Sequence, residues 1–181
     1  MSKKYIIESD FEYNGYRCVT TFCHIGHRCG YVGVPVGHPL YGKNYGDYTD
    51  YSFADIQKKP CDKMGVFPLF TAALLDPGTK VRYELLFNVH GSLTYSGKGK
   101  YPVESDLWWL GFDCAHAGDG QDLDKLQELW GDDPSIQTVI EFGKKYSMSD
   151  DVVRDLEYVQ QECRNLVDQI IEYTDKIKGE K

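Results

Sequence analysis

The sequence predicts an α+β fold, with an N-terminal antiparallel sheet built from hairpins, two short helices and one long C-terminal amphipathic helix. Strand-like patterns run to about residue 118, an Asn-Gly turn signal divides the first of them, and helical periodicity dominates after residue 119. Strands followed by helices are the order expected of an α+β domain. We therefore expect one domain over 1–181, with a β-rich portion over 1–118 and a helical portion over 119–181.

The N-terminal hairpins are predicted from turn residues. Asn14-Gly15 lies between two strand-like runs, and Asn-Gly is the dipeptide that tight strand connections favour. A second reversal is expected around Gly26. The cross-strand pairs expected there are Cys23 with Cys29 and Phe22 with Gly30.

The second turn carries polar side chains that suit a ligand. His27 and Arg28 are expected to be presented there without burial, ready to contact a polar or anionic group. The run from Cys23 to Cys29 also contains four residues capable of holding zinc. Because their spacing matches no familiar zinc module, we expect buried thiols and a polar turn, with no metal and no cofactor.

The least regular stretch is a loop over 35–65, rich in Gly and Pro. A loop of this length is either functional or mobile. Its tyrosines favour a lid or an interaction surface, and they are equally consistent with a segment that covers the edge of the sheet. They are Tyr41, Tyr45, Tyr48 and Tyr51.

The next expected strand covers Val81 to His90, where apolar and polar residues alternate. Its polar face includes Asn88 and His90. The residues Gly91 to Gly97 then indicate a turn into a short return strand, which would bring Thr94 or Tyr95 near the same end of the sheet.

The most informative block is 107–120, in which a core-type strand enters a cluster of Asp, Cys, His and Gly. Strand alternation places Cys114 on the core face, where a thiol has a raised pKa and poor access. The opposite face presents Trp109 and Asp113 as a surface for a flat group with a polar anchor. If the two strands are neighbours, Asn88 and His90 share this face, and His116 approaches from the following loop. The alternative to a binding face is a purely structural role, in which both tryptophans are sandwiched between layers and Asp113 caps a turn.

Three helices are expected in the C-terminal third. Two short ones cover Asp122 to Trp130 and Pro134 to Lys145, and a long one extends from an N-cap at Ser149 to Gly179. The apolar stripe of the long helix is widened by three further residues, and we expect a homodimer through it, or a helix simply laid across the sheet. These three residues are Val153, Val167 and Ile171.

Composition limits the class of protein. The net charge is -8, and all of the excess lies in 119–181, with 16 acidic and 8 basic residues against 12 of each in 1–118. This argues against direct nucleic-acid binding, which needs a basic patch. No run approaches the length of a membrane span and no signal peptide is evident, so we expect a soluble cytoplasmic protein with reduced cysteines.

Four segments and one residue pair are distinctive together: Gly26 to Pro35, Gly37 to Gly42, His90 to Tyr95 and Trp108 to Asp119, with Glu162-Cys163. Over roughly 20–165, they resemble a family of small proteins found in bacteriophages and prophages, which have mostly been described without a function. The family more often has a second glycine where this chain has Ser92. The resemblance implies a phage accessory protein in the host cytoplasm, for example one that acts in counter-defence.

Three functions remain open from the sequence. The first is sequestration of a small nucleotide-like ligand without turnover, with cations on phosphate, an aromatic ring on the base and Asp113 as acceptor. The second is a hydrolase that uses His and Asp, although we expect no catalytic residues of this kind, and the third is an inhibitor of a host defence complex by direct contact. The expected ligand-binding residues are His27, Arg28, Asn88, His90, Thr94, Trp109, Asp113 and His116.

Overall fold

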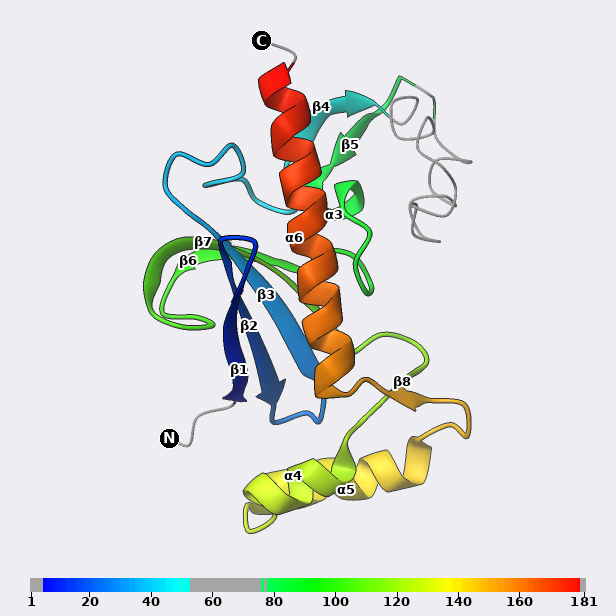
Figure 1. Ribbon diagram of the computed structural model, residues 1–181. Coiled ribbons are helices and arrows are strands. Elements are labelled where there is room, and N and C mark those ends of the chain that lie inside the picture. The colour runs from blue at the N-terminus through cyan, green and yellow to red at the C-terminus, as the bar shows by residue number, and fades with distance from the viewer. Residues whose placement is uncertain (1–4, 53–75, 77, 180–181) are drawn as a thin grey trace.

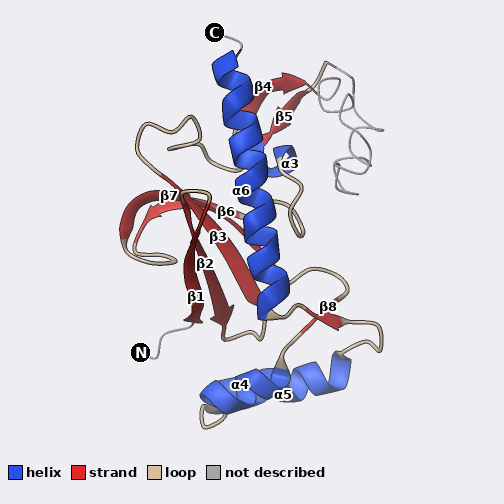
Figure 2. Cartoon of the chain, viewed as in Figure 1, coloured by secondary structure: helices blue, strands red, loops and turns tan. Residues whose placement is uncertain are grey.

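The computed structural model describes residues 5–52, 76 and 78–179, and these residues form the predicted α+β fold (Figure 1). Hairpin strands come first, and short helices and one long helix follow (Figure 2). The elements are β1 (Tyr5–Tyr13), β2 (Tyr16–Cys23), β3 (Arg28–Val34), β4 (Tyr48–Ser52), β5 (Lys80–Arg82), α3 (Tyr83–Leu86), β6 (Tyr95–Gly99), β7 (Ser105–Asp113), β8 (Asp119–Gly120), α4 (Leu123–Trp130), α5 (Pro134–Tyr146), β9 (Val152–Val153) and α6 (Leu156–Gly179).

The main sheet of the described residues has five antiparallel strands in the order β1-β2-β3-β7-β6. The predicted hairpin at Asn14-Gly15 is confirmed, since Tyr13 pairs with Tyr16 and both turn residues have positive φ. The strand β7 lies inside the sheet, between β3 and β6. Both of its edges are therefore occupied, and the residues that follow it leave from the interior of the sheet.

The second reversal forms near Gly26, but the expected register is wrong by two residues. Phe22 pairs with Arg28, and Gly30 pairs with Thr20. The turn closes early because Cys23 donates its N–H to the His27 carbonyl and accepts from the N–H of Gly26, which has a φ of 88°. A shift of two keeps each side chain on the predicted face.

The long helix α6 lies across one face of the sheet (Figure 1). Its apolar stripe is fully buried against β2 and β3 and forms the largest core. The stripe consists of Val159, Cys163, Leu166, Val167 and Ile170. The predicted start at Ser149 is wrong: α6 begins at Leu156, after Asp155 accepts the N–H of Tyr158, because Val152 and Val153 pair with β8 instead. Its 24 residues span about 36 Å.

The two short helices are confirmed. The Asp122 side chain accepts the N–H of Lys125 at the start of α4, and Asp133 caps α5, which has Pro134 in its first turn. Phe22 packs under both helices at one end of the sheet. No helix in the described part of the chain is long and apolar enough to cross a membrane.

The strand predicted over Val81 to His90 is wrong. After the short β5 the chain turns into α3 and then into a loop that packs along α6. The alternation of apolar and polar residues predicted burial correctly, since the apolar residues of the pattern are buried. The segment cannot pair with β7 as a strand, because both edges of β7 are already occupied. The backbone of Asn88 is satisfied instead by the side chains of Asn165 and Gln169 from α6.

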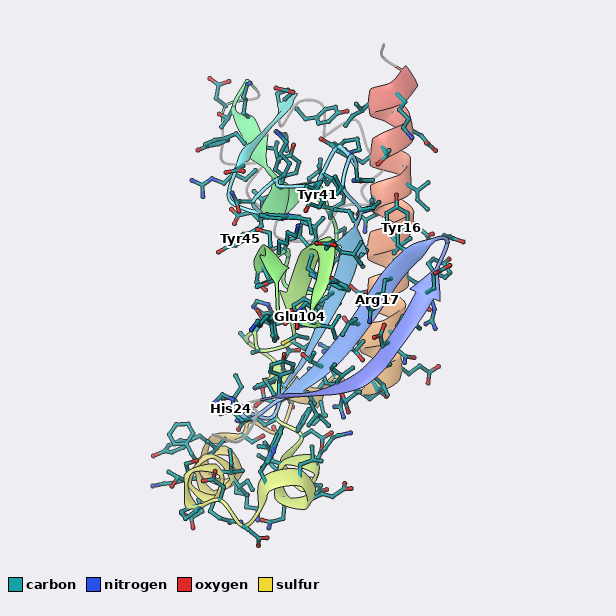
Figure 3. All side chains as sticks on the ribbon, turned by 90° about the vertical axis from the view of Figure 1, so that its left-hand side faces the viewer. Tyr16, Arg17, His24, Tyr41, Tyr45 and Glu104 are labelled. Atoms are coloured by element: carbon teal, nitrogen blue, oxygen red, sulfur yellow. The ribbon has the colours of Figure 1, made fainter. Side chains whose placement is uncertain are left out.

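The loop predicted over 35–65 contains β4, and its remainder after Ser52 lies outside the described residues. Tyr41 packs against Trp108 and donates to the carbonyl of Asp106, so it covers the first residues of β7, away from Asp113. Tyr45 is exposed at the same end of the molecule (Figure 3).

Candidate functional site

The candidate site lies where β7 ends and the loop before β6 meets α6. It brings together four of the residues predicted from the sequence, and it adds contacts from β8 and from the start of α6. The four predicted residues are His90, Thr94, Asp113 and His116. Three segments far apart in the sequence therefore contribute to one polar cluster.

Asp119 is the centre of this cluster. Its carboxylate accepts from Nε2 of His90 at 2.7 Å, from Nε of Arg154 at 2.9 Å and from the N–H of His116 at 3.0 Å. Only 2% of the Asp119 side chain is exposed. Burial opposes ionisation, but the hydrogen bonds from Arg154, His90 and His116 outweigh it and lower the pKa of Asp119. A buried carboxylate thus orients one imidazole and one guanidinium.

His90 uses both of its ring nitrogens within the protein. Nε2 donates to Asp119, and Nδ1, 2.9 Å from the hydroxyl oxygen of Tyr158, accepts from that hydroxyl. The backbone N–H of His90 donates to Glu162 on the next turn of α6. Burial raises the pKa of Tyr158, so its hydroxyl stays a donor. His90 is therefore a positioned member of the cluster without a free nitrogen for a ligand.

Asp113 and His116 form the accessible part of the site. Thr94 donates to Oδ2 of Asp113 at 2.7 Å, and the N–H of Ala115 donates to Oδ1 at 3.1 Å. Nε2 of His116 lies 3.6 Å from the same Oδ1, too far for a hydrogen bond. The side chains of His116 and Asp113 are 36% and 32% exposed, yet Nε2 itself is buried and has no hydrogen-bond partner among the described residues.

Gly91 allows the imidazole of His116 to approach the turn before β6. Its φ is 64°, and a Cβ atom there would lie 1.9 Å from Nε2 of His116. Replacement of Gly91 by Ala is expected to displace the ring of His116, as well as costing about 1–2 kcal/mol of backbone strain. The control is Gly42→Ala, because Gly42 has a φ of 80° but open space around it and lies outside the turn that holds His116. NMR of the His116 ring should change only in Gly91→Ala, and equal spectra would contradict the packing.

Ser92 follows Gly91 in the same turn and has a φ of 83°, a conformation that disfavours any residue with a Cβ. Replacement of Ser92 by Gly is expected to raise the free energy of unfolding by about 1 kcal/mol, because the left-handed strain disappears. Urea denaturation measures this change. An unchanged or lower midpoint would contradict the strain at this position.

Two predicted ligand residues, Arg28 and Trp109, are buried away from the cluster, so the exposure expected of them is wrong, and for Trp109 the alternative of a ring sandwiched between layers holds. Arg28 is 5% exposed and pairs with Glu8 and Asp122, so its charge is already used inside the protein. Trp109 is fully buried, because Val19 and Tyr31 flank it in a second core on the other face of the sheet. Neither side chain can meet a ligand.

The other two predicted residues lie beside the cluster rather than in it. Asn88 was expected on a strand next to β7. It lies in a loop instead, where its backbone is held against α6. His27 is half-buried near Cys114, and burial lowers its pKa. Its Nδ1 is buried and has no hydrogen-bond partner among the described residues.

The sequence did not single out the residues that hold His90. Asp119 closes the Trp108–Asp119 block but carried no role there, and Arg154 and Tyr158 fall within the predicted long helix without a role of their own. One signal was present: Tyr158 and Glu162 are four residues apart, which places both on one side of a helix. Nothing local indicated that this side faces a loop 68 residues away.

The cluster gives little support for catalysis by a thiol nucleophile or for a bound metal ion. Cys114 is buried as predicted, and burial raises the pKa of its thiol to about 12, which keeps it protonated. Among the described residues, no group of three or more His, Cys, Asp or Glu side chains is arranged to hold a metal ion.

Acid is expected to weaken the cluster through Asp119. Because its folded pKa lies below the ordinary value of 3.8, Asp119 contributes stability that is fully present above that pH and is lost as the pH falls through the lower folded pKa. Urea midpoints over this pH range should therefore fall more steeply for the native protein than for Asp119→Asn. If the urea midpoints of the two proteins fell in parallel with pH, the Asp119 carboxylate would contribute nothing to the pH dependence of stability.

Comparison with protein-family models, curated proteins and solved structures finds no match to this chain.

Proposed function

We propose that this protein binds a small nucleotide-like ligand through hydrogen-bond donors on its sugar or base, and that it retains the ligand unchanged. The observation that carries this proposal is the buried Nε2 of His116, which lacks a partner among the described residues and lies beside the half-exposed carboxylate of Asp113. An unpaired buried polar atom costs about 1–3 kcal/mol. A ligand group between the two side chains would remove that cost.

The charges around the cluster favour donors over phosphate. Asp113, Asp119 and Glu162 supply three carboxylates, and Arg154 supplies a guanidinium that is held by Asp119 and stacked on Tyr158. Carboxylates accept hydrogen bonds from hydroxyl and amino groups and repel phosphate oxygens. Since Arg28 is also unavailable, a ribose hydroxyl or a base amino group is the best-supported contact of the ligand.

Binding is better supported than hydrolysis. A hydrolase needs a free base and a nucleophile within reach of each other. Here both ring nitrogens of His90 are bonded within the protein. Nε2 of His116 has no partner among the described residues but is itself buried, and the nearest thiol, Cys114, is buried and protonated, so no nucleophile of the protein lies ready beside a base. Retention without turnover also suits a counter-defence protein of a phage, which is the context that the sequence resemblance implies. Such a protein would sequester a nucleotide-derived immune signal in the host cytoplasm.

The proposal is tested by retention. The full chain is dialysed against nucleosides, nucleoside monophosphates and cyclic dinucleotides, and bound compounds are released by heat and identified by mass spectrometry. We expect at least one compound to be retained and recovered unchanged. Recovery of an altered compound would favour the hydrolase, and retention of none would contradict the proposal.

Matched variants locate the binding. Asp113→Asn removes the accepting charge and is expected to weaken retention by about tenfold or more, as for other charge-assisted hydrogen bonds. Asp106→Asn is the control, because Asp106 is an exposed carboxylate at the opposite end of the same strand. Equal losses in the two variants, or no loss in Asp113→Asn, would place the ligand elsewhere.

A homodimer through α6 stays a prediction, and it must use a different surface from the one first expected. Val167 is buried against the sheet, Val153 lies outside the helix, and Ile171 packs against the core. The exposed side chains of α6 are polar ones such as Glu157, Gln161 and Asp168. Light scattering distinguishes the mass of a monomer from that of a dimer in solution, and a monomeric mass would contradict the dimer.

A further inference from the structure

Two cysteines meet at the turn between β2 and β3. Cys23 ends β2 and Cys29 is the second residue of β3. Cys29 lies opposite Thr21 and Cys23 opposite His27, so the two cysteines are diagonal neighbours on one face of the hairpin, close enough for each thiol to affect the ionisation of the other. Both side chains are partly accessible. His24, within the same turn, lies at the end of the sheet nearest α4 and α5 (Figure 3). The pair is thus held together by a tight hairpin at the surface of the sheet.

The surroundings assign different roles to the two thiols. The thiol of Cys29 lowers the pKa of Cys23 to about 6, against the effect of burial, although the Cys23 thiol donates to the His27 carbonyl at 3.0 Å. The pKa of Cys29 is raised by Cys23, by burial and by the charge of Asp113, its register partner on β7. One sulfur is suited to attack, and its neighbour keeps a proton.

The other described cysteines provide an internal contrast. Cys18, Cys114 and Cys163 are almost fully buried, and burial raises the pKa of each thiol. Reactivity of a thiol requires both access and thiolate character. In the described part of the chain, Cys23 combines the two.

We propose that Cys23 and Cys29 form a reactive dithiol that small organic disulfides, such as glutathione disulfide, convert reversibly into an intramolecular disulfide. The Cys23 thiolate attacks one sulfur of the oxidant, an S–S bond forms, and one thiolate leaves. Cys29 then loses its proton to that leaving thiolate and attacks the Cys23 sulfur, which expels the second thiolate. The second thiolate takes up from solvent the proton that Cys23 had released, so two protein thiols are oxidised and the organic disulfide is reduced to two thiols.

The proposal is tested with the full chain carrying Cys61→Ser, because Cys61 lies outside the described residues. The reduced protein is incubated with glutathione buffers of increasing oxidising strength and analysed by intact mass and peptide mapping. We expect a loss of two hydrogen atoms per chain that maps to a Cys23–Cys29 bond. Excess reduced glutathione should reverse it.

Variants separate the two roles. In Cys29→Ser the attack is expected to stop at a stable mixed disulfide on Cys23, and in Cys23→Ser neither product should accumulate at a comparable rate. Cys18→Ala, which removes a buried thiol, should behave like the parent. Alkylation of the parent by iodoacetamide, mapped residue by residue, needs no variant and should be fastest at Cys23, with a rate that rises through a pH of about 6.

Three outcomes would overturn the proposal. They are the absence of a Cys23–Cys29 bond at every glutathione ratio, an unchanged intramolecular product in Cys29→Ser, and alkylation of Cys114 or Cys163 as fast as that of Cys23. None of these results depends on a ligand at Asp113 and His116, so a failure here is distinct from a failure of the proposed binding function.

Discussion

Replacement of Arg28 by Met is expected to lower the free energy of unfolding by about 3 kcal/mol. The guanidinium donates to Glu8, to Asp122 and to the Arg154 carbonyl, and its side chain is nearly inaccessible. Removing one partner of a buried ion pair leaves an uncompensated charge and costs about 3–5 kcal/mol. We expect a loss at the lower end of this range, because Lys125 remains as a cation beside Glu8 when the guanidinium is removed. Urea denaturation measures the change.

Arg17→Met is the matched control. Arg17 pairs with Asp10 at the opposite end of the sheet (Figure 3), and both side chains are well exposed. Exposed pairs contribute about 1 kcal/mol or less. Similar small losses in both variants would show that Arg28 is not a structural cation. Such a result would revive its role as a ligand residue.

Trp109→Ala is expected to cost about 3–5 kcal/mol, as deletion of a large buried side chain usually does. The indole is fully buried between Val19 and Tyr31, and its N–H donates to Ser105. Thermal or urea unfolding measures this loss. The variant is expected to lose ligand only in proportion to its unfolded fraction.

Trp108→Ala, one position earlier on β7, is the control. Trp108 is partly exposed on the opposite face, where it packs on Tyr41 and donates to the carbonyl of Lys43. Its removal should cost clearly less. If Trp109→Ala stayed stable while losing a bound ligand, the indole would be a recognition surface, as the sequence first suggested.

Local signals predicted much of this fold. The Asn14-Gly15 hairpin and the starts of α4 and α5 depend on neighbouring residues alone, so a single sequence contains the necessary information. The alternation along β7 also predicted the burial of Cys114.

Long-range contacts account for the errors. Alternation could not show that the second face of β7 is covered as well, because Tyr95 and Tyr101 reach it from another strand and its connection. The exposure expected for Arg28 failed for the same reason, since Glu8 and Asp122 lie 20 and 94 residues away. Turn chemistry predicts where the chain reverses, and it does not predict which charges meet there.

The candidate site was partly predictable. The block around Asp113 and His116 indicated a polar cluster at a strand end, and Thr94 was correctly expected near Asp113. The role of Asp119 required its contact with Arg154, which follows β9 and precedes α6, and this contact has no local signature. Two further long-range contacts, to Tyr158 of α6 and to Asp119 of β8, explain why His90 is a positioned residue rather than a free base.

NMR of ¹⁵N-histidine-labelled protein during titration with the nucleosides and nucleotides of the dialysis panel tests the central claim most directly. A retained compound should shift the Nε2 resonance of His116, because that nitrogen lacks a partner in the described part of the chain. His38 should stay unchanged, since its Nε2 already lies within hydrogen-bond distance of Tyr16 and Thr174. Binding of any of these compounds with no change at His116, or with an equal change at His38, would contradict a recognition site at Asp113 and His116.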